Sequence, residues 1–312
     1  DALRVGLGVG LAALSSWYYG FILALLLPVY LLARGDEVRG LLADRRTWVG
    51  AGVALLTVGA LCVPFIVPYL QIATGGNVRA PLEDAIFWSA SPLDYLAPNP
   101  RHPIWGGAVQ ALMWPFPSID MPYEFLHSLG WLTLALAMVG WRRMAGRRWR
   151  ALKWAMATAF VLSLGPVLKL GRLPLGVPMP AALVRAVVPV ANGIRSWGRF
   201  SAFVALGVSV LAAAGLHYVL RDRPARQQKA LALAALATVL FLAWTGPAEL
   251  VEVAPRPVDE WLAGQPGHDP MMQYPIEVAL SGPSMLYTRY HGKPVVFGYG
   301  TYFPFRFRAD HP

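Results

Sequence analysis

Cysteine is nearly absent from this chain of 312 residues, because only Cys62 is present and it lies within an apolar run. A single thiol excludes an internal disulfide framework and a zinc site made of several cysteines. Charged side chains are also scarce. They make up 14% of the residues, whereas soluble globular proteins have about 25%. Since 56% of the residues are hydrophobic, the composition indicates a polytopic membrane protein.

The common motifs of soluble enzymes are absent as well. The chain has no P-loop, no GxSxG, no HExxH and no GxGxxG that follows a strand. Its 6 histidines show no metal-ligand spacing, so the residues predict no metal site. The glycine-spaced stretch GLGVG at 6–10 lies in an apolar run, where it predicts close helix packing rather than phosphate binding.

The net charge is +10, but the basic residues are grouped in short clusters between apolar runs. This arrangement is typical of cytoplasmic loops and argues against nucleic-acid binding. Three loops, at 34–46, 142–153 and 221–229, hold about half of the 27 Lys and Arg residues. The positive-inside rule places these loops in the cytoplasm and places 71–124, 169–199 and the tail after 246 outside.

Six apolar runs are long enough to cross a bilayer. They lie at 17–32, 48–70, 125–139, 152–168, 200–220 and 230–244. With a shorter run before residue 15, they predict an all-α membrane domain over 1–246 with about six to seven transmembrane helices.

The stretch LSSWYYGF at 14–21 interrupts the first apolar run, which extends from 5 to 33. One helix of that length would measure about 43 Å, against roughly 30 Å for the bilayer core. The run 17–32 must end inside because a basic loop follows it, and Arg4 favours the inside for the start of the chain. We therefore expect a helical hairpin that turns outside at Ser15 and Ser16. The alternative is one long tilted helix.

The outer segment 71–124 is rich in proline and aromatic residues. Seven prolines between Pro92 and Pro122 argue against long regular structure. PLEDAIFWS at 81–89 predicts a short interfacial helix with acidic residues in its first turn. The aromatic residues, among them Trp88 and Trp105, suit sugar binding, because a pyranose face stacks on a flat ring. An aromatic belt at the membrane interface is the alternative.

The outer segment 169–199 carries five positive charges, against the positive-inside trend, at Lys169, Arg172, Arg185, Arg195 and Arg199. A pair of guanidinium groups at the bilayer surface can hold a phosphate bidentately. Contact with lipid headgroups or with loop carboxylates is the alternative. The centre of this outer segment, 180–188, predicts a short amphipathic helix that lies on the membrane.

The tail 247–312 differs in composition from the rest. It predicts a helix at 258–263, strands at 271–277 and 293–300, and a helix at 282–292 between the strands. We interpret this as the start of a small extracytoplasmic α/β domain. The chain begins at Asp1 without a methionine and ends without a helix stop, so we expect a fragment of a longer protein.

Four segments together resemble bacterial GT-C glycosyltransferases, including the protein-mannosyltransferase-like and YfhO-like proteins, over their C-terminal portion. The segments are LAALSSWYYGFILALLLPVYLL (11–32), YLAPNPRHPIWG (95–106), LSLGP to LAAAGL (162–216) and YHGKPVVFGYG (290–300), and the LSLGP to GRF block (162–200) is the most specific part. The resemblance implies a polyprenyl-phosphate sugar donor, inverting transfer on the extracytoplasmic face of the inner membrane, and often a divalent cation. It also implies catalytic carboxylates in a first outer loop, which would precede this chain.

The residues leave several candidates and three functions open. Glu124 and His127, three residues apart at the start of the third run, form a candidate acid–base couple, with helix capping and packing as the alternative. Asp94 is a further carboxylate candidate. Candidates for substrate binding are Arg185, Arg195, Arg199, Trp88 and Trp105. Besides a glycosyltransferase, the chain could be a non-catalytic protein of envelope or polysaccharide assembly, or a transporter. The scarcity of ionisable residues at mid-membrane argues against a transporter.

Overall fold

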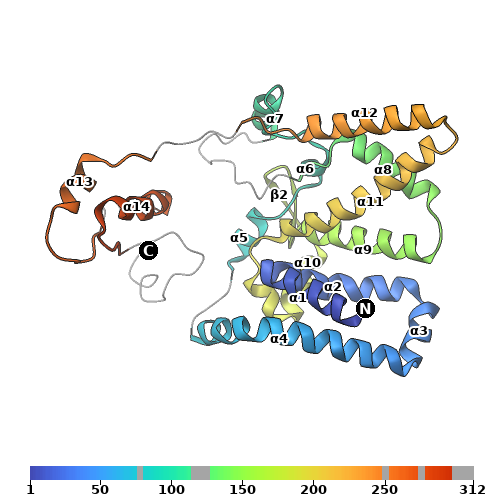
Figure 1. Ribbon diagram of the computed structural model, residues 1–312, viewed down its shortest axis with the longest axis horizontal. Coiled ribbons are helices and arrows are strands. Elements are labelled where there is room, and N and C mark those ends of the chain that lie inside the picture. The colour runs from blue at the N-terminus through green and yellow to red at the C-terminus, as the bar shows by residue number, and fades with distance from the viewer. Residues whose placement is uncertain (76–79, 114–126, 248–252, 273–277, 297–312) are drawn as a thin grey trace. The chain divides into compact units, whose positions relative to one another are not determined.

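The computed structural model describes residues 1–75, 80–113, 127–247, 253–272 and 278–296. The chain forms two compact units, 1–246 and 247–312. It is mostly helical, and its one sheet among the described residues has two antiparallel strands (Figure 1). The helical membrane character expected from the composition is therefore present, whereas the sheet in the first unit was not predicted.

Three helical segments within the described residues are long and apolar enough to cross a membrane. They are α2 (Trp17–Arg34), the part Arg45–Val67 of α4 (Arg45–Gly75), and Trp197–Leu220, which joins the 3₁₀ turn η3 (Trp197–Phe200) to α11 (Ser201–Leu220). The other predicted runs correspond to the 13-residue α8 (Trp131–Arg143), the 17-residue α9 (Arg147–Ser163) and the 19-residue α12 (Ala225–Ala243). The three long segments indicate a membrane protein.

Two of the predicted spans have different ends in the structure. The third was expected at 125–139, but α8 begins at Trp131, directly after Gly130 with its positive φ of 74°. The fourth was expected to reach residue 168, but α9 ends at Ser163 and the chain turns at Gly165 into strand β1 (Val167–Leu170). The prediction was wrong there because apolar residues continue through the turn, and hydrophobicity alone does not separate helix from strand.

The first apolar run forms the expected hairpin. Helix α1 (Ala2–Ser15) is separated from α2 by Ser16, which has an extended backbone with φ −164° and ψ 128°. Helix α1 packs along α4 in the same direction, as three neighbouring pairs show: Ala2 with Gly50, Gly6 with Ala54, and Gly10 with Leu61. Since α3 (Asp36–Ala43) links α2 to α4, the helices α1 and α2 run in opposite directions.

The arginine-rich turns gather at one end of the first unit. Arg147 at the start of α9 lies 3.6 Å from the Asp36 carboxylate in α3. Arg143 at the end of α8 stacks on Tyr218 near the end of α11, with its Cζ 4.7 Å from the ring centre. All three predicted cytoplasmic loops are thus neighbours, as the positive-inside rule requires.

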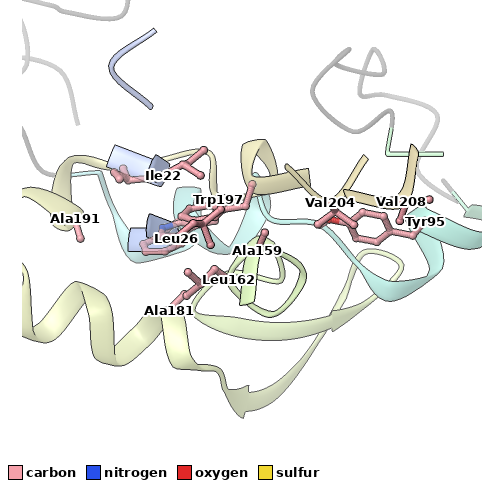
Figure 2. Packing of buried hydrophobic residues seen from close by; sticks show 14 of the residues in the cluster. Ile22, Leu26, Tyr95, Ala159, Leu162, Ala181, Ala191, Trp197, Val204 and Val208 are labelled. Atoms are coloured by element: carbon pink, nitrogen blue, oxygen red, sulfur yellow. The ribbon is translucent and has the colours of Figure 1, made fainter. Parts of the chain in front are cut away.

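The core of the first unit is built around η3. Trp197 and Phe200 are buried and stacked, with ring centres 5.7 Å apart. Figure 2 shows Trp197 beside Ile22 and Leu26 of α2, and Tyr95 beside residues of α11. The turn before α11 therefore joins α2 and α9 to the loop segments at the end opposite the arginine-rich turns.

Short elements make up the two predicted outer segments. The first contains α5 (Leu82–Phe87), α6 (Pro92–Leu96) and α7 (Gly106–Met113), and α5 has the expected acidic residues, Glu83 and Asp84, in its first turn. The second contains β1 and β2 (Leu173–Pro178), α10 (Pro180–Val187) and the 3₁₀ turn η2 (Pro189–Gly193). The helix predicted at 180–188 is confirmed as α10.

The second unit has α13 (Pro257–Ala263) and α14 (Val278–His291), at the positions expected for its helices. Met271 and Val295 form a parallel bridge on either side of α14. This is the connection expected for β-α-β, although 273–277 and 297–300 of the two predicted strands lie outside the described residues. The buried Asp259 carboxylate pairs with Arg256, whose guanidinium stacks on Tyr287 with Cζ 3.8 Å from the ring centre.

We expect a Gly6→Ala substitution to destabilise the α1–α4 contact, whereas Gly8→Ala leaves it intact. A Cβ atom at Gly6 would lie 2.7 Å from the Ala54 carbonyl oxygen and 2.7 Å from the Thr57 Cβ, but one at Gly8 would meet nothing within 4 Å. Overpacking of this kind costs about 1–3 kcal/mol. Thermal unfolding of both variants in detergent measures the effect, and equal midpoints would contradict the tight packing.

Candidate functional site

A buried polar cluster lies where the 88–91 loop meets the end of α9 and the β1–β2 hairpin. Its buried members come from three separate parts of the chain: Ser89, Ser91, Asp94, Ser163 and Lys169. The cluster lies at the end of the helices opposite the arginine-rich turns. It is therefore on the side predicted to face outward.

Asp94 stabilises the start of α6. Its carboxylate oxygen Oδ2 accepts a hydrogen bond of 2.7 Å from the Ser91 N–H, and the Ser91 hydroxyl accepts one of 3.3 Å from the Leu93 N–H. This is a reciprocal capping box. Burial raises the pKa of the Asp94 carboxyl above its ordinary value, while the Ser91 hydrogen bond and the positive charges of Arg172 and Lys169 act in the opposite direction.

Lys169 connects β1 to the 87–89 backbone. Its side chain is only 2% exposed, and its Nζ donates to the carbonyl oxygens of Phe87 at 2.8 Å and Ser89 at 2.6 Å. The pKa of Lys169 is lowered to about 7, chiefly by burial and also by the charge of Arg172, while the charge of Asp94 acts in the opposite direction. A neutral amine keeps two N–H donors, which match the two carbonyl oxygens.

Gly165 allows the end of α9 to contact the 88–91 loop. It has a positive φ of 72°, and a Cβ atom there would lie 1.7 Å from the Ser89 hydroxyl oxygen. The Ala90 N–H donates to the Ser163 carbonyl at 2.9 Å, and the Tyr95 hydroxyl donates to the Ser163 Oγ at 2.6 Å. Only glycine combines this backbone conformation with so close an approach.

Two of the predicted phosphate-binding arginines lie on aromatic rings beside this cluster. The Arg195 Cζ is 4.8 Å from the centre of the Trp88 ring, and the Arg199 Cζ is 4.2 Å from the centre of the Tyr18 ring. Both guanidinium groups stack in the manner of a cation–π contact. Trp88 and Arg195, both predicted site residues, are therefore neighbours in the structure.

Arg185 has a different environment. Its guanidinium donates to the backbone carbonyls of Ile194 at 3.1 Å and Ala80 at 2.9 Å. Burial lowers the pKa of Arg185 below its ordinary value. These contacts hold α10 to the segments before α5 and before η3, so Arg185 supports the backbone around the site.

His127 lies before α8 rather than inside it, because that helix begins at Trp131. Its ring stacks on Tyr95 with centres 5.7 Å apart, and a Cβ atom at Gly198 would come within 3.0 Å of its Nε2. The Gly198 N–H donates to the Trp88 carbonyl at 3.0 Å. His127 is thus packed against the turn η3, which carries Arg199 and follows Arg195. Glu124, its expected partner, lies outside the described residues.

Trp105 belongs to a separate cluster at the end of α12. It stacks on His102 with ring centres 3.6 Å apart. The His102 Nδ1 accepts from the Ile104 N–H, so its proton lies on Nε2, which donates to the Phe241 carbonyl at 3.1 Å. Asn99 donates to the Ala243 carbonyl at 3.1 Å. The YLAPNPRHPIWG motif therefore caps the last carbonyls of α12, a structural role that sequence reasoning did not anticipate.

Comparisons with protein-family models, curated proteins and solved structures found no match to this chain. The site is therefore interpreted from its own residues. Within the part of the chain that the structure describes, no group of three or more His, Cys, Asp or Glu side chains could hold a metal ion.

We expect a Lys169→Met substitution to reduce the pH dependence of stability between about pH 7 and 10. In the unfolded chain the lysine keeps its proton up to its ordinary pKa of 10.5, whereas in the folded chain it loses it near 7. The unfolded state thus binds more protons in this interval, so the free energy of unfolding rises with pH by up to roughly 1 kcal/mol per unit. Unfolding in detergent at pH 7, 8 and 9 measures the slope. The same slope in the variant would contradict a buried neutral amine.

A second expectation concerns Gly165. The substitution Gly165→Ala is expected to destabilise the protein more than Gly171→Ala. Both residues have positive φ, at 72° and 60°, but a Cβ atom at Gly171 meets nothing within 4 Å. Backbone strain of about 1 kcal/mol is common to both variants, and the clash with Ser89 is added only at Gly165. The difference between their unfolding midpoints reports the clash. Equal midpoints would show that the loop does not pack against α9 this closely.

Proposed function

We propose that this chain is part of a membrane glycosyltransferase, which transfers a sugar from a polyprenyl-phosphate donor on the extracytoplasmic face of a bacterial inner membrane. In this proposal α1, α8, α9 and α12 complete a domain of six to seven spans. The observation that carries it is the pair Arg195 and Arg199, which lie just before and within the turn η3 that opens α11 and are each stacked on an aromatic ring.

Stacking suits these two arginines to phosphate binding. In a guanidinium stacked on a ring, the N–H donors lie in the plane of the group, which is the geometry in which an arginine binds phosphate oxygens in pairs. The rings also restrict the side-chain rotamers, so less conformational entropy is lost when a ligand binds. The turn opens an apolar 24-residue segment. If this segment crosses the membrane, as we propose, both arginines lie near the membrane surface, where a lipid-linked phosphate would be.

The catalytic base in this proposal is a carboxylate outside the described residues, with Glu124 as the candidate in this chain. Asp94 is less suited to that role, because its carboxylate caps α6 and is buried. A base must reach the acceptor hydroxyl to remove its proton. Arg195 and Arg199 would supply positive charge to the departing phosphate. Among the described residues, no set of His, Cys, Asp or Glu side chains fits the divalent cation that the resemblance implies.

The second candidate is a non-catalytic protein that binds a lipid-linked saccharide during envelope assembly. It is favoured by the structural contacts of Asp94 and Lys169, which bind neighbouring backbone groups. Such a protein would use the same arginine pair for binding. The two candidates differ in whether sugar leaves the lipid.

The test is sugar transfer by the full-length protein in vesicles, using a panel of polyprenyl-phosphate hexoses. Arg199→Ala and Arg195→Ala are each expected to lower transfer by about 10- to 100-fold, because each removes charged donors to the phosphate. Arg223→Ala, in the exposed turn after α11, is the matched control and is expected to keep full transfer. Unfolding midpoints show whether each variant folds.

Unchanged transfer in both folded arginine variants would remove the pair from the mechanism. If the wild-type protein binds the donor but does not transfer sugar to any acceptor, and the variants lose binding, the non-catalytic candidate is correct.

A further inference from the structure

The strand β2 has an unusual combination of composition and exposure. All six of its residues, LPLGVP, are exposed, and none of them carries a polar side chain. Leu173 is 65% exposed, although it lies in a described and compact part of the first unit. An exposed sheet face ordinarily alternates polar with apolar residues when it meets water. The composition of β2 therefore indicates an apolar environment on its outer side.

Helix α10 extends this apolar surface. Leu183, Val187 and the following Val190 are each about two-thirds exposed, and Leu183 is 67% exposed. The one charged side chain of the helix, Arg185, is directed to the carbonyls of Ile194 and Ala80. Ala181 on the opposite side is buried in the core. The outward side of α10 is consequently apolar.

We infer that the β1–β2 hairpin and α10 form a lipid-binding surface that lies at the boundary between acyl chains and headgroups in the outer leaflet. The surface is continuous with the membrane-spanning helices. β1 starts four residues after α9 ends, α10 packs against α9, and the chain then enters the segment Trp197–Leu220 (Figure 1). Lipid that surrounds α9 and α11 thus reaches the hairpin.

The backbone determines the depth of this surface. Among the described residues β2 pairs with β1 alone, so its outer edge has no strand partner there. Unpaired N–H and C=O groups cost several kcal/mol each in hydrocarbon. Pro174 and Pro178 remove two N–H donors from this strand. The remaining groups need water or headgroups. The hairpin therefore lies at the interface, with its leucine and valine side chains directed into the acyl chains.

The surface does not depend on the sugar-transfer proposal, because it follows from exposure and composition alone. Its test uses nitroxide spin labels at Leu175→Cys and Leu183→Cys in the full chain, with Cys62→Ala as background, in vesicles of phosphatidylcholine and phosphatidylglycerol. Collision of each label with apolar oxygen and with a water-soluble nickel chelate is measured by electron paramagnetic resonance. Labels at two further positions calibrate the ratio of the two collision rates. Leu55 in α4, 75% exposed, represents lipid, and Asp222 after α11, with an 83% exposed side chain, represents water.

We expect the ratio of oxygen collisions to nickel-chelate collisions at both labels to be well above that of Asp222 and below that of Leu55, which is near the middle of the segment Arg45–Val67. A ratio at the Asp222 level would show a surface in water and overturn the inference. Low collision with both reagents would also overturn it, because the surface would then be covered by protein, and dipolar broadening would identify a second copy. Circular dichroism confirms that the labelled variants fold.

Discussion

The contact between Gly165 and Ser89 is the constraint on which the outer part of the first unit depends. Because Gly165 has no side chain, the end of α9 can lie against the 88–91 loop. The Ala90 N–H then reaches the Ser163 carbonyl, and Lys169 in the next strand reaches the carbonyls of Phe87 and Ser89. The same loop positions Trp88, whose carbonyl binds Gly198 and whose ring supports Arg195. One close backbone approach therefore holds together segments from three regions of the chain.

The positive charges of 169–199, a segment predicted to lie outside, have more than one role. Lys169 and Arg185 each donate to two backbone carbonyls of neighbouring segments. Arg195 and Arg199 instead lie on aromatic rings at the start of a membrane-spanning segment. The first pair stabilises the architecture, and the second pair carries the proposed function. A charge count could not separate these roles, since it does not show which partner each side chain meets.

Prediction from the sequence succeeded where the signal is local. The hairpin at Ser16 follows from one basic residue and a length limit, and α5, α10 and α13 follow from local composition. It was wrong at the end of α9, where the apolar residues of VLKL continue the run but form a strand. Among the site residues, Trp88, Arg195 and His127 do lie near one turn, whereas Trp105 stacks on His102 beside α12. The lysine inside an apolar strand was the one signal that could have identified the buried cluster.

The sequence by itself determined that the first unit is a helical membrane domain and that its arginine-rich turns share one end. Both properties follow from the transfer free energies of single residues, which do not depend on distant partners. Only the tertiary structure decided which charges are buried and which face outward. Lys169 and Phe87 are 82 positions apart, and Asn99 and Ala243 are 144 apart. Contacts of that range depend on the packing of the whole unit, and no local pattern specifies them.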